Sequence, residues 1–213
     1  MSIPLGDIGA GAHICSIYRY PLERLVATSQ FFIHGLQSNE KCIFIASNKA
    51  RKQLIDECAR KKIEVTKYLE SGQLLLLDNS ETYLNDDGSF SVERVMGMLK
   101  ETEVKAIEQG YGGVRFAGEL PFIAGSPIDK ETLCAYEAIV DTYLPSSKSR
   151  ALCHYSEEKY DHTVLAKMMN SHRFVILYGN CYENRKRTKD DPEDYQSILN
   201  KIVEGDVVYG AKS

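Results

Sequence analysis

The chain has 213 residues, of which 43% are hydrophobic and 26% charged, a composition that suits one globular domain with a core of ordinary size. The formal net charge of −4 gives no electrostatic reason to expect binding to DNA or RNA. The first residues lack a basic stretch followed by a long apolar run, and no window approaches the ~18 apolar residues of a membrane span. We therefore expect a cytoplasmic protein without a signal peptide or a membrane segment.

The first half of the chain alternates short apolar runs with amphipathic segments. HICSIY (13–18) predicts a strand, and Pro21 then opens a helix whose apolar stripe reaches Leu36. KCIFIA (41–46) predicts a second strand. A helix over 49–62, a shorter helix ending before Gly72, and a third strand, QLLLLD (73–78), follow it.

The second half continues the alternation. Ser91 caps a helix that Gly110 ends, and Asp129 caps another that stops before Pro145. A further helix is expected over 161–170. The predicted strands are GGVRFAGEL (112–120), RALCHY (150–155) and FVILYG (174–179). The alternation predicts an α/β fold with three layers, a mostly parallel sheet with helices on both faces.

One composition break divides the chain. Residues 184–195, NRKRTKDDPEDY, form a mixed charge run that closes on Pro192. We expect one domain over residues 1–184, followed by a charged C-terminal extension over 185–213 with a short helix and a terminal strand. A solvated surface is the default interpretation of such a run, and docking to a partner is the alternative.

Ligands of open α/β sheets bind beyond the carboxyl ends of the strands. Here those ends carry aromatic, amide, carboxylate and histidine side chains, which suit a small organic ligand. The residues are Tyr18, Arg19 and Tyr20, then Asn48, Asp78 and Asn79, then Glu119 to Phe122, then His154 and Tyr155, and finally Gly179, Asn180, Tyr182 and Glu183.

Two opposite charges stand on one face of the fourth predicted strand. Arg115 and Glu119 are four residues apart, so their Cα atoms lie about 13 Å from each other and a direct bridge is awkward. Because an unpaired buried charge costs several kcal/mol, each is expected to have its own partner. We expect Glu119 to belong to the ligand site and Arg115 to support the fold.

The motifs of the common enzyme classes are absent from the sequence. The segment after the first strand, YRYPLERL, has no Gly, Lys, Ser or Thr to form a P-loop, and neither GxGxxG nor GxSxG occurs. The six cysteines contain no CxxC pair and behave as small hydrophobes. His13 and Cys15 share a strand face, but two groups do not make a metal site. We expect neither an enzyme nor a bound cofactor or metal.

The order and spacing of several short motifs resemble the MEDS domain, the sensory domain of the dichloromethane-responsive regulator DcmR and its methanogen and methylotroph relatives. The similarity extends from about Ala10 to about Asn184. The motifs are HICSIY (13–18), FFIHGL (31–36), NEKC (39–42), GQL (72–74), YL (83–84), GSF (88–90), GY (110–111), RFAGE (115–119), YE (136–137), LCHY (152–155) and YEN (182–184).

This resemblance implies a scaffold similar to the RecA/KaiC-type core, with Tyr18-Arg19-Tyr20-Pro21 at the P-loop position. It also implies a sensory role in signalling or transcriptional regulation, in which the domain binds a hydrocarbon derivative or methylated compound. Many relatives attach an output module, and the residues after Asn184 are too few for one, so a separate signalling partner is expected. Arg185-Lys186-Arg187 replaces the Pro and aromatic residue that often follow in the family.

Three functions remain open at this stage. The favoured one is a stand-alone sensory module with a small organic ligand, no direct contact with nucleic acid and no membrane. Its predicted ligand-binding residues are Tyr18, Tyr20, Arg115, Glu119, His154, Tyr155 and Tyr182. The alternatives are a nucleotide-binding, KaiC-like regulator, and an interaction module that docks a partner protein or forms a homodimer.

Overall fold

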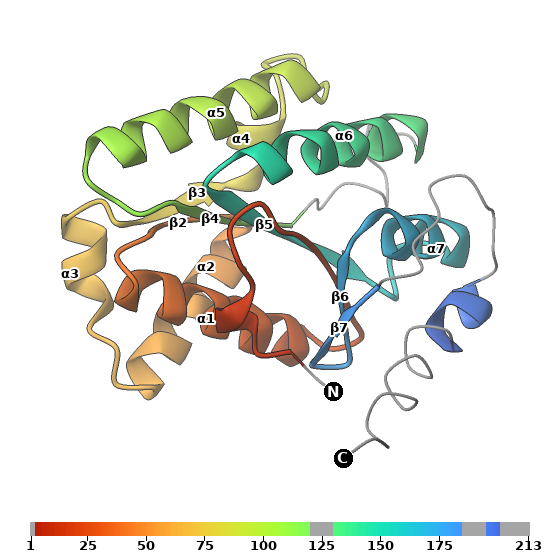
Figure 1. Ribbon diagram of the computed structural model, residues 1–213, viewed down its shortest axis with the longest axis horizontal. Coiled ribbons are helices and arrows are strands. Elements are labelled where there is room, and N and C mark those ends of the chain that lie inside the picture. Colours follow the sequence, from red (N-terminus) through yellow and green to blue (C-terminus); the bar gives the residue numbers. More distant parts are fainter. Residues whose placement is uncertain (1–2, 120–129, 185–194, 201–213) are drawn as a thin grey trace.

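The computed structural model describes residues 3–119, 130–184 and 195–200. Its centre is a seven-stranded sheet of order β3-β2-β4-β5-β1-β6-β7 (Figure 1). Only the pairing of β6 with β7 is antiparallel among these strands. The strands are β1 (His13–Tyr18), β2 (Lys41–Ala46), β3 (Leu74–Asp78), β4 (Val114–Glu119), β5 (Ser149–Ser156), β6 (Phe174–Leu177) and β7 (Asn180–Glu183).

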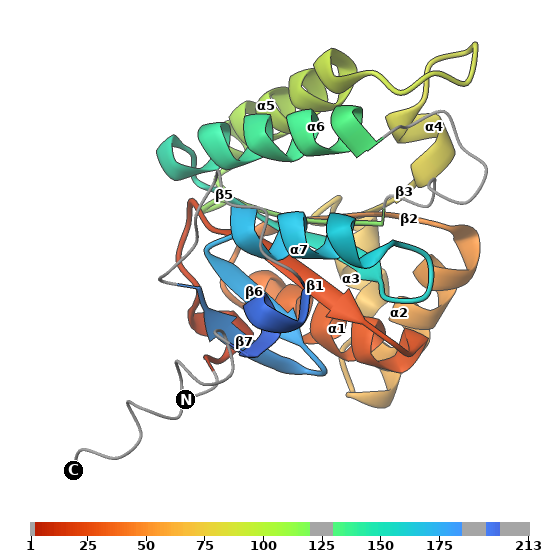
Figure 2. The same ribbon diagram turned by 90° about the vertical axis from the view of Figure 1, so that its right-hand side faces the viewer.

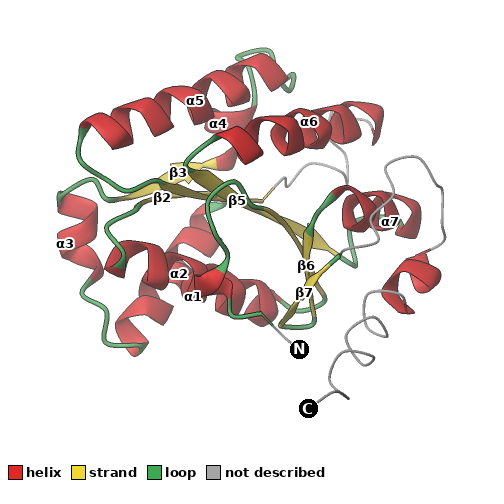
Figure 3. Cartoon of the chain, viewed as in Figure 1, coloured by secondary structure: helices red, strands yellow, loops and turns green. Residues whose placement is uncertain are grey.

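Helices cover both faces of the sheet, as the turned view and the cartoon show (Figures 2 and 3). One apolar core lies between the sheet and α1, α2 and α3, and the other between the sheet and α4, α5, α6 and α7. The helices are α1 (Pro21–Gln37), α2 (Asn48–Arg60), α3 (Val65–Glu70), α4 (Asn79–Tyr83), α5 (Val92–Glu108), α6 (Lys130–Tyr143) and α7 (His162–Ser171), with 3₁₀ turns η1 (Leu5–Asp7) and η2 (Leu144–Ser146).

The three-layer α/β prediction is confirmed, and the six predicted strands and the main helices form where expected, except for positions that fall outside the described residues. Those positions are Leu120 to Phe122, the Asp129 cap, most of the charge run and the expected terminal strand. The sequence analysis missed α4 and β7. Tyr178 (φ 49°) and Gly179 (φ 85°) form a tight turn that folds β7 back along β6.

The turn between β1 and α1 is closed by an acidic side chain. The Glu23 carboxylate accepts hydrogen bonds from the backbone N–H groups of Arg19 (2.8 Å) and Tyr20 (3.4 Å). Arg19 extends outward, where its guanidinium pairs with Glu157 (2.6 Å) and donates to the Tyr178 hydroxyl (2.6 Å). The loop that would cradle phosphate in a P-loop protein therefore holds the chain's own carboxylate.

A buried guanidinium anchors α1 to the middle of the sheet. Arg115 on β4 is 0% exposed and donates to Glu40 (2.5 Å), to the Phe31 carbonyl (3.1 Å) and to His34 Nδ1 (3.1 Å). A Cβ on Gly35 would lie 2.5 Å from the Arg115 side chain, so glycine is needed for the close approach of α1. Arg115 thus supports the fold, as the sequence analysis predicted.

The described part of the C-terminal extension packs on the domain. Residues 195–200 are helical, and Tyr195, Ile198 and Leu199 are buried in the core that includes α7. The Tyr195 ring stacks on His162 with 4.6 Å between centroids, and its hydroxyl donates to Glu157 (2.9 Å). Residues 195–200 are therefore part of the folded domain, and none of the helices in the described ranges is long and apolar enough to cross a membrane.

Replacing Arg115 with Met tests the anchor. We expect Arg115→Met to lower the free energy of unfolding by about 3–5 kcal/mol, because it leaves Glu40 partly unpaired in the core. Urea denaturation measures the change. Arg51 pairs with Asp78 at 2.9 Å in a more exposed setting, so Arg51→Met should cost less than about 1 kcal/mol. Equal losses in the two variants would contradict the anchoring role.

Candidate functional site

The predicted ligand-binding residues do not form one site, because they divide between the two faces of the sheet. Tyr18, Glu119 and His154 end neighbouring strands and meet on the face covered by α1. Tyr155 points to the opposite face, where its ring packs edge-on against Tyr160 at 5.3 Å between centroids. One pocket containing both His154 and Tyr155 side chains is excluded by strand alternation.

The other three predicted residues lie elsewhere. Arg115 is four residues before Glu119 on β4 and forms an ion pair with Glu40. Tyr20 is 66% exposed at the start of α1. Tyr182 pairs with Val175 near the amino end of β6, because β7 runs antiparallel, so it is far from the carboxyl edge.

The residues that meet at the carboxyl edge form a strand-end cluster of Tyr18, Arg24, Thr28, Glu119 and His154. Arg24 of α1 makes a buried ion pair with Glu119 and lies over the Tyr18 ring, 5.7 Å from its centroid. Thr28 contacts His154 Nε2 at 2.9 Å. Glu119 thus has its own partner, as expected, and that partner is a helix residue which the strand pattern could not reveal.

The hydrogen bonds of Thr28 determine the tautomer of His154. The Thr28 hydroxyl donates to the Arg24 carbonyl (2.9 Å), so its oxygen must accept from His154 Nε2–H. His154 Nδ1 is then an acceptor, and it has no hydrogen-bond partner among the described residues. Burial, reinforced by the Arg24 charge, lowers the pKa of His154 to about 3, so the ring is neutral. Burial also raises the pKa of Glu119, an effect that Arg24 opposes.

A cavity of about 20 Å³ lies on the opposite face, between the sheet and α5 and α6. This volume slightly exceeds what one water molecule needs. Its lining is mainly aliphatic and aromatic and includes Ile45, Leu99, Phe116, Val140, Tyr83, Tyr136, Cys153 and Tyr155. The Tyr155 hydroxyl is buried, and burial, reinforced by the Glu137 carboxylate, raises its pKa. The cavity is therefore suited to a small apolar molecule.

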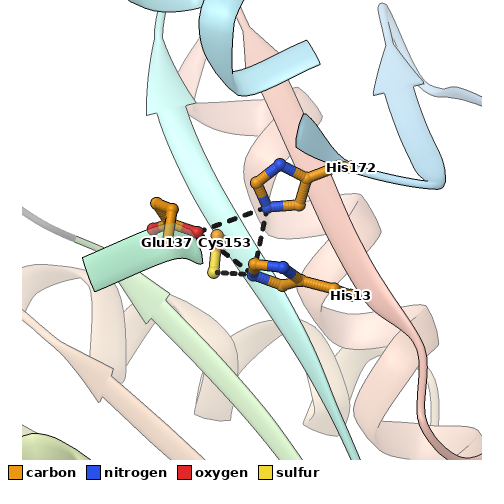
Figure 4. A group of neighbouring side chains, drawn as sticks. All are labelled: His13, Glu137, Cys153 and His172. Atoms are coloured by element: carbon orange, nitrogen blue, oxygen red, sulfur yellow. Dashed lines mark hydrogen bonds and ion pairs between the residues drawn. The ribbon is translucent and has the colours of Figure 1, made fainter. Parts of the chain in front are cut away.

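Beside this cavity, four buried side chains converge in what we call the His–Glu–Cys cluster (Figure 4). They are His13 at the start of β1, Glu137 on α6, Cys153 on β5 and His172 at the end of α7. His13 Nε2 lies 3.0 Å from His172 Nε2, 3.1 Å from Glu137 Oε2 and 3.5 Å from Cys153 Sγ. His172 Nε2 lies 3.3 Å from the same Glu137 oxygen.

The Nδ1 atoms of the two imidazoles, on the side away from the cluster, each lie near an oxygen atom. His172 Nδ1 lies 2.6 Å from the Met168 carbonyl, and His13 Nδ1 lies 3.7 Å from Asp141 Oδ1. Burial lowers the pKa of His172, whereas the Asp141 and Glu137 carboxylates outweigh burial and raise that of His13. Burial acts to raise the pKa of Glu137, but the two histidines hold it well below its usual range.

The sequence analysis did not find this cluster. It noted His13 only as one of two groups on a strand face and did not connect it with the other three residues. The four residues are far apart in the chain and none belongs to a short metal-binding motif. The one signal of this cluster in the sequence was the position of His13, a polar residue at the start of a mostly apolar strand.

A comparison with models of protein families shows which family the chain belongs to. The family model described as MEDS, the methanogen/methylotroph, DcmR sensory domain, matches residues 12–173. The chain belongs to the MEDS family. The MEDS match contains the strand-end cluster, the cavity lining and all of the His–Glu–Cys cluster, whereas β6, β7 and residues 195–200 lie beyond it. A search of curated proteins found no match.

A double-mutant cycle tests the Arg24–Glu119 pair in this MEDS domain. Arg24→Met alone should lower the free energy of unfolding by about 2–4 kcal/mol, because Glu119 then stays buried without its cation. Adding Glu119→Gln should recover about 1–3 kcal/mol of this loss. Urea denaturation of both single variants and the double variant gives the coupling.

The exposed pair Glu101–Lys105, 3.4 Å apart on α5, is the control. Its cycle, with Glu101→Gln and Lys105→Met, should give a coupling below about 0.5 kcal/mol. A coupling as small as this for Arg24 and Glu119 would show that the strand-end cluster does not depend on their charges.

Proposed function

We propose that this MEDS domain is a small-molecule sensor whose ligand, a hydrocarbon derivative or methylated compound of a few atoms, occupies the cavity between the sheet and α5 and α6. The observation that supports this is the mainly apolar lining of a cavity in a chain that belongs to a sensory family. Small apolar cavities exclude water and favour apolar guests.

Tyr155 connects the cavity with the rest of the sheet. It lines the cavity and lies on β5 next to the strand-end cluster, so a ligand that moved it would act on a central strand.

We further propose binding without catalytic turnover. A nucleotide-dependent enzyme on such a sheet needs free backbone N–H groups after β1 to hold phosphate. In this chain the Glu23 carboxylate accepts from the backbone of Arg19 and Tyr20, which disfavours a phosphate at the same place. The nucleotide-binding alternative therefore gains no support from the β1–α1 turn.

The output is proposed to be a separate signalling protein. Tyr20 and Leu22, at the start of α1, are 66% and 63% exposed and stand one helical turn or less from Arg24 of the strand-end cluster. Exposed large apolar side chains beside a buried charge pair suit a protein contact. A pull-down comparing the wild-type chain with Leu22→Ser tests this, and light scattering reports whether the partner is a second copy.

Ligand binding is tested by NMR titration in sealed tubes with dichloromethane, methanol and dimethyl sulfide. We expect one of these compounds to shift the methyl signals of Val140 and Ile45, because both residues line the cavity. Leu99→Phe fills the cavity and should abolish these shifts while changing the free energy of unfolding by less than about 1.5 kcal/mol.

The matched control is Leu54→Phe, at a buried position of α2 on the other face of the sheet. That variant should lose about 1–3 kcal/mol of stability through overpacking but keep the ligand response. Unchanged spectra with all three compounds, or equal responses in both variants, would refute the cavity as the sensing site.

A further inference from the structure

We propose that the His–Glu–Cys cluster binds a divalent metal ion of the zinc class. This inference goes beyond small-molecule sensing and does not depend on it, since all four donor groups belong to the protein. It is carried by the spacing of the donor atoms, the direction of their lone pairs and the support behind the two imidazoles.

The spacing matches a tetrahedral ion. Zinc binds nitrogen and oxygen at about 2.0–2.2 Å and sulfur at about 2.3 Å, which places tetrahedral donor atoms about 3.3–3.6 Å apart. Four of the six separations between donor atoms run from 3.0 to 3.5 Å. All four donor atoms lie within 4.8 Å of one another, so one ion can reach them after side-chain adjustment.

The lone pairs face one another. The Met168 carbonyl can only accept, so His172 Nδ1 carries the proton and Nε2 presents a lone pair to the cluster. His13 Nδ1 faces the Asp141 carboxylate, which favours the same tautomer. Two imidazole nitrogens 3.0 Å apart, with a carboxylate oxygen 3.1 and 3.3 Å from them, need either a shared proton or a metal ion between them, and the titration below separates the two.

The surroundings of the donors are those of a metal site. Histidines that bind metals usually donate their other N–H to a carbonyl or a carboxylate. The Met168 carbonyl takes this role for His172, and the Asp141 carboxylate lies 3.7 Å from His13 Nδ1, just beyond hydrogen-bond distance. The Glu137 carboxylate is 0% exposed, and both imidazoles approach the same one of its oxygens, at 3.1 and 3.3 Å. An ion would supply the positive charge that such a group needs.

The donor set selects the type of ion. One thiolate, two imidazoles and one carboxylate suit borderline ions such as Zn²⁺ and Co²⁺, whereas Mg²⁺ and Ca²⁺ prefer oxygen donors. Binding would convert the Cys153 thiol to a thiolate and release its proton to solvent. The thiolate and the Glu137 carboxylate together then balance the two charges of the ion.

The position of the site gives it a structural consequence. Its donors come from β1, β5, α6 and α7, so one ion would connect two central strands with two helices of the same layer. Cys153 also lines the cavity, which places the ion at the cavity wall.

The experiment is metal titration of the purified, reduced full chain, first with Zn²⁺ and then with Co²⁺ as a spectroscopic probe. We expect one ion per chain by elemental analysis after gel filtration. Thermal unfolding should shift upward on addition of Zn²⁺, since the ion binds the folded state. The Co²⁺ form should show a thiolate-to-metal charge-transfer band and strong visible bands of tetrahedral geometry.

Variants locate the site. Cys153→Ser should remove the charge-transfer band, and Glu137→Gln should lower Zn²⁺ affinity at least tenfold. Asp141→Asn, behind His13, should lower it by about 10–100-fold, the usual effect of a residue that supports a metal-binding histidine. Cys42→Ser is the matched control, a buried cysteine on the other face of the sheet, and should leave both metal content and spectrum unchanged.

Two results would overturn the proposal. The first is a wild-type chain that binds neither ion and shows no thermal shift. The second is equal binding by wild type, Cys153→Ser and Glu137→Gln. Either result would mean that a shared proton, not a metal ion, holds the two histidines and the carboxylate together. A dichloromethane titration of the metal-free and zinc-loaded chains reports on the cavity separately, so the two proposals can fail independently.

Discussion

The placement of a single buried cation sets the geometry of this domain. A guanidinium that is wholly removed from water needs an acceptor at each of its nitrogens, and Arg115 meets this condition through Glu40, Phe31 and His34. These contacts fix the height and rotation of α1 over β4. The same Glu40 also holds Arg150 (2.9 Å), so β5 is tied to the same point. Glu119 and His154, four residues further along these two strands, are thereby brought under Arg24 and Thr28 of α1.

The layers of the fold could be predicted from the sequence because they depend on local periodicity. Runs such as KCIFIA and the stripes on the helices identify buried strands and covering helices without knowledge of their neighbours. The partners of charged residues could not be predicted in this way. Arg115 and Glu40 are 75 residues apart in sequence, and only the strand order brings them together. The reversal at Tyr178 and Gly179 also escaped notice, so Tyr182 was assigned to the wrong end of the sheet.

The site was harder to predict than the fold for a related reason. Alternation along a strand implies that Cys153 and His154, adjacent in one motif, point to different faces of the sheet. It could not indicate that Cys153 meets His13 from the neighbouring strand and Glu137 and His172 from two helices. Each of these four residues has an ordinary local context, and their significance arises only from convergence. Family membership establishes a sensory domain, while the chemistry of recognition has to be argued from the assembled side chains.

The alternation of β5 has a mechanical consequence. Cys153 and His154 are joined by one peptide unit, whose Cα atoms are held about 3.8 Å apart. The side chain of the first ends in the layer of α6 and α7, and that of the second contacts α1. A stiff parallel strand between two hydrogen-bonded neighbours cannot bend locally to absorb a displacement at one of these positions. A shift of β5 at Cys153 is therefore conveyed through the sheet to His154, so the two layers, although separated by the sheet, are linked by one covalent step.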